Sequence, residues 1–240
     1  MLTGAGVSTA SGIPDFRGVD GVWTKNPIAE LSANIDDYLS DPELRVRSWI
    51  ARRDNPAWKA EPNEGHLALA ELERHRSVRI LTQNVDRLHH KAGSTPRKVY
   101  ELHGNMFEAV CSQPAPRCDW TGPMRTVLDR VDAGEPDPPC ERCGGILKPA
   151  TVMFGQNLDE DVLAMSAAVA RSSAVFLAVG SSLRVQPAAG LCEIAALHGA
   201  TLVIVNNEPT PYDDLATEII REPISKALPD LVAKLTRPPR

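Results

Sequence analysis

Residues 174–180 read AVFLAVG and residues 201–205 read TLVIV, and these two runs decide the fold. Each run is apolar at consecutive positions and not at alternate ones. A strand of this kind needs cover on both faces, as in a parallel sheet between two layers of helices. Segments with helical spacing separate the apolar runs, so we expect an α/β fold with a doubly wound parallel sheet.

Further elements extend this pattern toward both ends of the chain. Between residues 28 and 54, apolar residues recur at helical spacing: Leu31, Ile35, Leu39, Leu44, Trp49 and Ile50. Ser40-Asp41-Pro42 is expected to break this helical segment. Other helices are expected over residues 65–73, 160–171, 188–197 and 225–235, and strands over 2–3, 78–81, 174–179 and 201–205.

Composition excludes several classes of protein. The 240 residues are 42% hydrophobic and 24% charged, as in an ordinary globular domain. A net charge of −5 and an aromatic content of 5% argue against nucleic-acid binding. The sequence has neither an apolar run long enough to span a bilayer nor the features of a signal peptide. We therefore expect no membrane partner and a place in the cytoplasm, where thiols stay reduced.

A glycine turn, Gly4-Ala5-Gly6, follows the first short strand. Such a turn before a helix lets backbone N–H groups approach a pyrophosphate. The third glycine of a dehydrogenase fingerprint is missing, and the following helix is interrupted early by Gly12, Pro14, Gly18 and Gly21. The loop is therefore unsuited to an ordinary hydride-transferring enzyme. Two interpretations stay open: a tight turn without a ligand, and a loop whose side chains cover a cofactor.

Polar residues follow the strand that ends near residue 81. Ligands of open α/β sheets lie beyond the carboxyl ends of strands, so Gln83, Asn84 and Asp86 are placed to hold ribose hydroxyls or a carboxamide. The alternative is a turn that these side chains stabilise by bonding their own backbone. His103 comes later, in ELHGN, and suits a general base, with Gly104 leaving room for a substrate. Most histidines only complete a hydrogen bond, so His103 alone decides nothing.

Four of the five cysteines gather in one proline-rich stretch. Cys140 and Cys143 have the spacing of a zinc knuckle, whereas Cys111 and Cys118 are separated by a wider gap. Four thiolates fill a tetrahedral zinc site and leave no position for water, so the ion is expected to be structural. The stretch has too few apolar residues for its own core and needs such a staple. Cys192 stands apart and is expected to pack in a helix.

The ordered motifs resemble those of the sirtuin family of NAD-dependent protein-lysine deacylases. They run along nearly the whole chain: GAGVSTASGIPDFRG, TQNVDRLHHKAG, ELHGN, the four cysteines, PATVMFGQNL, VGSSLRVQPAAGL and IVNNEPT. The resemblance implies one sirtuin catalytic domain over residues 1–240. Its Rossmann-like part would cover about 1–105 and 149–240, with a small inserted zinc-ribbon lobe at about 106–148. A helical cofactor-loop segment at about 19–60 would pack near that lobe.

The resemblance also implies a role for each motif. His103 would be the general base, with Asn84 and Asp86 as its catalytic partners. The NAD-binding residues would be Gly4, Ala5, Gly6, Ser8, Asp15, Phe16, Arg17, Trp23, Gln83, Asn84, Asp86, Gly180, Ser181, Ser182, Asn206, Asn207, Glu208 and Ile224. The substrate backbone would pair with Val152, Met153, Phe154 and Gly155, as an added strand. Zinc would be held by Cys111, Cys118, Cys140 and Cys143.

The reaction implied by the resemblance consumes NAD without hydride transfer. The acyl oxygen of a modified lysine attacks C1′ of the ribose as nicotinamide leaves, and His103 helps a ribose hydroxyl attack the resulting alkylimidate. Water then releases free lysine and O-acyl-ADP-ribose. Partners would be acylated proteins or peptides, and the chain would act as a monomer. The alternatives are mono-ADP-ribosylation of proteins and a module that binds acyl-lysine without turnover.

Three departures from the family pattern carry expectations. Members usually have more strand ahead of the glycine loop, so a longer chain is expected to be more stable. Arg87 stands where glycine is common. Members that prefer succinyl- or malonyl-lysine carry Tyr-x-x-Arg, and here Trp49 replaces the tyrosine while Arg52 persists. We expect neutral acyl groups, acetyl first. The alternative role for Arg52, and the commoner one for an arginine in such a helix, is pairing with a surface acid.

Overall fold

The computed structural model of the protein describes residues 1–26, 30, 33–113 and 116–236. Its main sheet has six strands in the order β3-β2-β1-β7-β8-β9, all parallel. The strands are β1 (Leu2–Thr3), β2 (Ile80–Thr82), β3 (Val99–Glu101), β7 (Val175–Val179), β8 (Thr201–Val205) and β9 (Glu218–Ile220). The parallel sheet expected from the apolar runs is confirmed.

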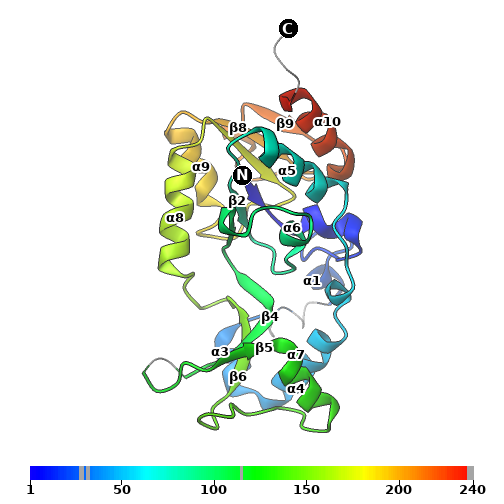
Figure 1. Ribbon diagram of the computed structural model, residues 1–240, viewed down its shortest axis with the longest axis vertical. Coiled ribbons are helices and arrows are strands. Elements are labelled where there is room, and N and C mark those ends of the chain that lie inside the picture. The colour runs from blue at the N-terminus through cyan, green and yellow to red at the C-terminus, as the bar shows by residue number, and fades with distance from the viewer. Residues whose placement is uncertain (27–29, 31–32, 114–115, 237–240) are drawn as a thin grey trace.

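Helices cover both faces of this sheet. One face is covered by α5 (Glu64–His75) and α10 (Ile224–Thr236), and the other by α8 (Glu160–Arg171) and α9 (Gly190–Leu197) (Figure 1). Successive strand residues point to opposite faces, so in β7 Leu177 and Val179 join the α5–α10 side while Phe176 and Ala178 join the α8–α9 side. Cys192 is fully buried on the second side, in the packing position expected for it.

The chain reverses its direction of travel across the sheet beside β1. From β1 it proceeds outward through β2 to β3 on one side, and later through β7, β8 and β9 on the other. The carboxyl ends of β1 and β7 therefore meet at the topological switch point, where doubly wound sheets bind their ligands.

A second unit lies at the opposite end of the molecule (Figure 1). Its antiparallel sheet has the order β5-β4-β6. The elements there are β4 (Gly104–Cys111), β5 (Thr121–Pro123), α7 (Met124–Asp132), β6 (Leu147–Thr151), α3 (Ile35–Ser40) and α4 (Pro42–Arg53). The expectation that the cysteine region lacks a sufficient core is only half right. Met124, Val127 and Leu128 of α7 form a buried cluster together with Tyr38 of α3 and Trp49 of α4.

The predicted break between α3 and α4 has a local cause. The Asp41 carboxylate accepts hydrogen bonds from the N–H groups of Glu43 (2.8 Å) and Leu44 (3.0 Å), so Asp41 caps α4 and Pro42 takes its first position. Ile28 and Leu31 of the predicted helical segment lie outside the described residues. Short elements complete the chain: α1 (Val22–Lys25), α6 (Leu88–Lys91) and the 3-10 segments η1 (Ala5–Ser11), η2 (Pro56–Trp58), η3 (Pro96–Lys98) and η4 (Asp213–Leu215).

Candidate active site

Three glycines bring the backbone of the first loop against the end of β7. Gly4 N–H donates to the Val179 carbonyl (2.9 Å) and Gly6 N–H donates to the Gly180 carbonyl (2.8 Å). A Cβ on Gly4 would lie 2.7 Å from the Gly180 oxygen, and one on Gly180, whose φ is +62°, would lie 2.5 Å from the Val7 nitrogen. Side chains are excluded at these positions, so the glycines hold η1 directly over the switch point.

The ends of four adjacent strands meet there with neutral polar groups. Gln83 follows β2, Gly4 follows β1, Ser181 follows β7 and Asn206 follows β8. The Gln83 amide N–H donates to Ser181 Oγ (2.9 Å), which joins two of these ends. Side-chain amides and hydroxyls suit ribose hydroxyls, and the close backbone approach at the glycine turn suits a pyrophosphate, so this group of residues fits a dinucleotide.

Asn84 and Asp86 are buried and face Ser8. Ser8 Oγ donates to Asp86 Oδ2 (2.6 Å), and the Asn84 amide donates to Ser8 Oγ (3.1 Å) and to the Gly4 carbonyl (3.1 Å). Asp86 Oδ1 also accepts from the Leu88 N–H (2.9 Å), which is the local turn contact considered as an alternative. Ser8, Asn84 and Asp86 therefore together hold the glycine loop against the segment that follows the neighbouring strand β2.

His103 lies in the turn between β3 and β4 with its protonation pattern fixed by the backbone. Its Nδ1 lies 3.1 Å from the Gln83 carbonyl oxygen, which accepts only, so the proton sits on Nδ1 and Nε2 is the free base. Burial lowers the pKa of His103 below its usual value, and the hydrogen bond to Gln83 opposes that shift in part. The imidazole is therefore neutral at pH 7 and able to accept a proton.

Gly104 serves a purpose other than the one predicted. Its φ is +68°, and a Cβ there would lie 2.0 Å from the Ala150 oxygen of β6. The glycine leaves room for the neighbouring strand, not for a substrate. The turn that carries His103 is thereby tied to β6, and the Val152 N–H donates to the His103 carbonyl (2.9 Å).

The predicted cofactor loop meets the predicted substrate strip through aromatic side chains. The Arg17 guanidinium lies 4.4 Å from the centre of the Trp23 ring, and Trp23 lies 4.6 Å from Phe16 and 5.6 Å from Phe154. Asp15 supports the loop from inside, because its Oδ1 accepts from the Gly18 N–H (2.9 Å). Phe16 is 45% exposed, so one side of this aromatic cluster remains open to solvent.

The strip from Val152 to Gly155 has much of its backbone engaged already. Phe154 N–H donates to the Ala33 carbonyl (2.7 Å), and the Phe154 carbonyl accepts from Ile35 N–H (2.9 Å). Met153 N–H donates to the Gln156 side chain (3.2 Å). Within the part of the chain that the structure describes, Gly155 has no backbone hydrogen bond and the Val152 carbonyl has no backbone donor, so the strip keeps backbone groups open to an added strand.

The predicted NAD-binding residues after β7 and β8 lie apart from Ile224, the last residue of the predicted set. The Asn206 side chain donates to the Glu208 carbonyl (2.8 Å), and Ser182 and Asn207 accompany them at the ends of β7 and β8. Ile224 instead begins α10 and packs against the α5–α10 side of the sheet, 3.4 Å from where a Gly65 Cβ would lie.

One residue that sequence reasoning missed shapes this loop. Arg221 donates to the carbonyls of Asn206 (2.8 Å) and Glu208 (3.0 Å), and its guanidinium pairs with Asp213. The signal that could have found it is a single arginine directly after a short strand.

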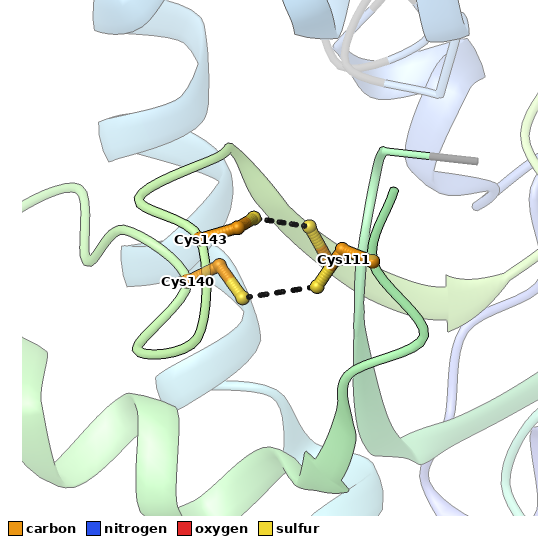
Figure 2. Close-up of side chains that lie close together, drawn as sticks. Cys111, Cys140 and Cys143 are labelled. Atoms are coloured by element: carbon orange, nitrogen blue, oxygen red, sulfur yellow. Dashed lines mark hydrogen bonds between the residues drawn. The ribbon is translucent and has the colours of Figure 1, made fainter. Parts of the chain in front are cut away.

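The four predicted zinc ligands converge in the second unit. Their sulfur atoms all lie within 4.8 Å of one another, with 3.5 Å between Cys111 and Cys143 and 3.7 Å between Cys118 and Cys140. Figure 2 shows the side chains of Cys111, Cys140 and Cys143 directed toward one another. A Zn–S bond of about 2.3 Å in a tetrahedron requires sulfurs about 3.8 Å apart, so the site fits a zinc ion.

Arg52 and Trp49, singled out as an acyl-specificity pair, have separate surroundings. Trp49 is fully buried and its indole N–H donates to Asp137 (3.2 Å). Arg52 forms no ion pair with any residue that the structure describes, so the alternative of its pairing with a surface acid is wrong; burial lowers its pKa and leaves Nε without a partner. Burial, with the Arg52 charge adding to it, also lowers the pKa of nearby Lys148 to about 8. Two cations thus lie close together beside β6, where Lys148 donates to the Thr151 carbonyl (3.0 Å).

A doubly wound parallel sheet with a neutral histidine beside its switch point and a lobe of four converging cysteines is the arrangement of a nucleotide-binding protein with a metal-binding lobe. The chain belongs to the Sir2 family, whose profile matches residues 4–187.

Similar proteins span nearly the whole chain. "NAD-dependent protein deacetylase 2" of Streptomyces coelicolor is 56% identical over 236 residues, 98% of this chain and 96% of its own. A protein of Sulfolobus acidocaldarius named "NAD-dependent protein deacetylase" is 44% identical and covers 98% of this chain and 88% of its own.

Solved structures agree with these relatives. "Sir2-p53 peptide-NAD+" has a TM-score of 0.84 at 37% identity and covers 97% of this chain and 91% of its own. "Structure of Sir2Tm bound to a propionylated peptide" has a TM-score of 0.83 at 35% identity, with the same coverage.

Among the described residues, none of the helices has the length and apolar character needed to cross a membrane.

Proposed function

We propose that this protein is an NAD-dependent protein-lysine deacetylase that transfers the acyl group from lysine to ADP-ribose and releases nicotinamide. The observation that carries the proposal is His103, held neutral with Nε2 free beside the polar strand ends. Relatives named as deacetylases over nearly the full chain support the same activity. NAD, as the co-substrate, supplies a ribose carbon that becomes electrophilic when nicotinamide departs.

Each group of residues at the site would have its own role in this reaction. His103 Nε2 takes the proton from a ribose hydroxyl, and the Gln83 carbonyl keeps the other ring nitrogen protonated so that Nε2 stays basic. Asn84 and Asp86 hold the nicotinamide-ribose side, and the Asn84 Oδ1 atom is available to accept from a hydroxyl. The backbone of the Gly4–Gly6 turn receives the phosphates. Arg17, Phe16 and Trp23 close over the ribose and exclude water.

The remaining predicted residues complete this arrangement. Ser181 and Ser182 with Asn206, Asn207 and Glu208 would receive the adenosine half, and Gly155 would offer the backbone edge for the acylated peptide. Zinc, held by the four cysteines, would stabilise the second unit, because four protein ligands leave no position for reacting water. The division into a Rossmann-like part, a lobe at about 106–148 and a helical segment at about 19–60 remains part of the proposal.

We further propose a cytoplasmic monomer that binds neither nucleic acid nor membranes. Four thiolate ligands need reducing conditions, which the cytoplasm supplies. A monomer suffices because every residue assigned above comes from one chain. A single species of one chain in sedimentation velocity would support it.

The acyl group we propose is acetyl. Trp49 lacks a phenol hydroxyl and its N–H is already engaged by Asp137, so it cannot help bind a distal carboxylate. Arg52, whose Nε has no partner among the described residues, is the observation that favours succinyl- or malonyl-lysine as the second candidate, with Lys148 as a second cation nearby. Arg52→Met separates the two. The variant should turn over an acetylated peptide as fast as the wild type does, and it should lose any turnover that the wild type shows with the matching succinylated peptide. If the wild type turns over the succinylated peptide faster than the acetylated one, succinyl and not acetyl is the preferred acyl group.

The deacetylase assignment is tested by mass spectrometry of an acetyl-lysine peptide incubated with NAD. Wild type should release nicotinamide, free lysine peptide and O-acetyl-ADP-ribose, and His103→Ala should release far less of all three. His198→Ala is the matched control, because that imidazole also bonds a backbone carbonyl (Ile194, 2.8 Å) but lies exposed after α9. ADP-ribose attached to protein without O-acetyl-ADP-ribose would instead indicate a mono-ADP-ribosyltransferase. Binding of the peptide without any product would indicate a non-catalytic module.

A further inference from the structure

A buried histidine outside all the predicted motifs contacts the glycine loop from helix α5. His66 lies in the first turn of α5 and is fully buried. Its Nε2 lies 3.4 Å from Ser8 Oγ, and its Nδ1 accepts from the Asn63 backbone N–H (3.4 Å). Asn63 caps the same helix and donates from its amide to the Val7 carbonyl (2.9 Å) and to Ser11 Oγ (2.9 Å). The start of α5 therefore holds η1 at three points.

The direction of each hydrogen bond in this cluster is determined. Asp86 is a carboxylate and accepts only, so Ser8 must donate its single hydroxyl proton to Asp86 across the 2.6 Å contact. Ser8 Oγ is then an acceptor for both Asn84 and His66. Since His66 Nδ1 accepts from Asn63, the ring proton is on Nε2, which donates to Ser8. All three polar neighbours of Ser8 thus agree on one orientation of its hydroxyl.

The charge state of His66 supports this pattern. Burial lowers its pKa to about 4, against an opposing effect of the Asp86 charge, so His66 is neutral at pH 7. The other titratable group that faces the ring is His89, 5.0 Å away between ring centres. The pKa of His89 is also lowered by burial, and its Nε2 bonds Thr3 Oγ1 (2.9 Å). A neutral His66 keeps one donor for Ser8 and one acceptor for the helix cap.

We propose that His66 and Asn63 are positioning residues for NAD: His66 acts through Ser8 to set the orientation of Asn84 and Asp86, and Asn63 holds η1 through Val7 and Ser11. The inference rests on the proposed function, because it assumes that these two side chains meet the NAD ribose. Loss of the His66 donor leaves Ser8 Oγ with one donor fewer and frees η1 on the α5 side. The NAD site then loosens, whereas the acyl-lysine side, built from residues 152–155, is untouched.

The test measures steady-state kinetics and NAD binding for His66→Leu and His66→Gln. A net hydrogen bond is worth about 1 kcal/mol, so His66→Leu should raise the KM for NAD about 5-fold and leave the KM for acetyl peptide unchanged. His66→Gln keeps an N–H donor and should restore most of the affinity. Asn63→Ser retains a helix cap but loses the amide contacts to η1, and should also raise the KM for NAD. His75→Leu, exposed on the same helix, is the control and should match the wild type.

A double-mutant cycle decides whether His66 acts through Ser8. In a Ser8→Ala background His66→Leu should have no further effect on the KM for NAD, because the acceptor is already gone. Additive effects of the two substitutions, equal rises in both KM values, or a wild-type KM for NAD in His66→Leu would each overturn the inference.

NAD binding, followed as the rise in melting temperature with NAD, separates this inference from the proposed function. A wild type that binds NAD without turning over acetyl peptide would refute the deacetylase assignment, while weaker binding by His66→Leu would still support the inference. A wild type that binds no NAD would refute both.

Discussion

Removal of one zinc ligand should unfold one end of the molecule and leave the other intact. Cys143→Ser is the sharpest change, because Cys143 is exposed and its replacement opens no cavity. Structural zinc contributes about 10–16 kcal/mol to the folding of small domains, as much as the about 5–15 kcal/mol that keeps a whole domain folded. A serine hydroxyl stays protonated and does not replace a thiolate. The three remaining cysteines should therefore hold zinc weakly, and the second unit should open.

The tryptophans report this opening directly. Of the four in the chain, Trp49, Trp58 and Trp120 belong to or pack against the cluster that α7 shares with α3 and α4, whereas Trp23 lies in α1. Opening of the cluster should shift the emission toward that of exposed tryptophan. The sheet should persist, because its two sides have apolar clusters of their own, so most of the far-ultraviolet circular dichroism should remain.

The measurements are zinc content by elemental analysis, tryptophan emission and deacetylation, compared for wild type, Cys143→Ser and the control Cys192→Ala. Wild type and control should each carry one zinc per chain, and Cys143→Ser should carry much less. Deacetylation should fall with zinc content, because β4 and β6 position His103 and the strip. A zinc-free Cys143→Ser protein with wild-type emission and activity would show that the reasoning is wrong.

Two further predictions concern the glycine contact and the base. Gly180→Ala should destabilise the protein by several kcal/mol and abolish NAD binding, because the new Cβ would lie 2.5 Å from the Val7 nitrogen. Gly199→Ala is the control, because Gly199 has φ +85° but lies in open space, and this change should lower the free energy of unfolding by only about 1–2 kcal/mol, as measured by thermal unfolding. Because burial lowers the pKa of His103, the free base persists below pH 6.5, so kcat/KM should be flat near pH 7 and decline only as the pH falls through the lowered value. A decline that begins above pH 7 would contradict the assigned environment of His103.

The sequence predicted the sheet because its signals were local and strong. The apolar runs at 174–180 and 201–205 and the helix at 160–171 appear where they were expected. The edge strand β9 was missed because it has only three residues, Glu218–Ile220, which are largely exposed and show no alternation of apolar and polar side chains. Helix α7 was missed because prolines dominate its surroundings, although Met124, Val127 and Leu128 have helical spacing and are all buried.

The candidate site was predictable in its residue types but not in its contacts. Motif order identified His103 and the four cysteines, yet only the fold shows that a backbone carbonyl sets the tautomer of His103. Arg87 adopts φ +55°, which explains why glycine suits that position, and its guanidinium reaches Glu101 (3.3 Å). His66 was missed because it acts through Ser8, which is distant in the sequence, and Arg221 because the strand β9 that precedes it was itself missed.

The bond between Gly104 and β6 has a mechanical consequence. Gly104 pairs with Thr151, and the residues on either side, His103 and Val152, are joined by a hydrogen bond. The base and the beginning of the substrate strip are therefore the two roots of a single hairpin-like arm. Because His103 also bonds the Gln83 carbonyl (3.1 Å) after β2, the same arm anchors the start of the strip to the nucleotide end of the main sheet, and a tilt of its far end would have to break that bond before the base could move.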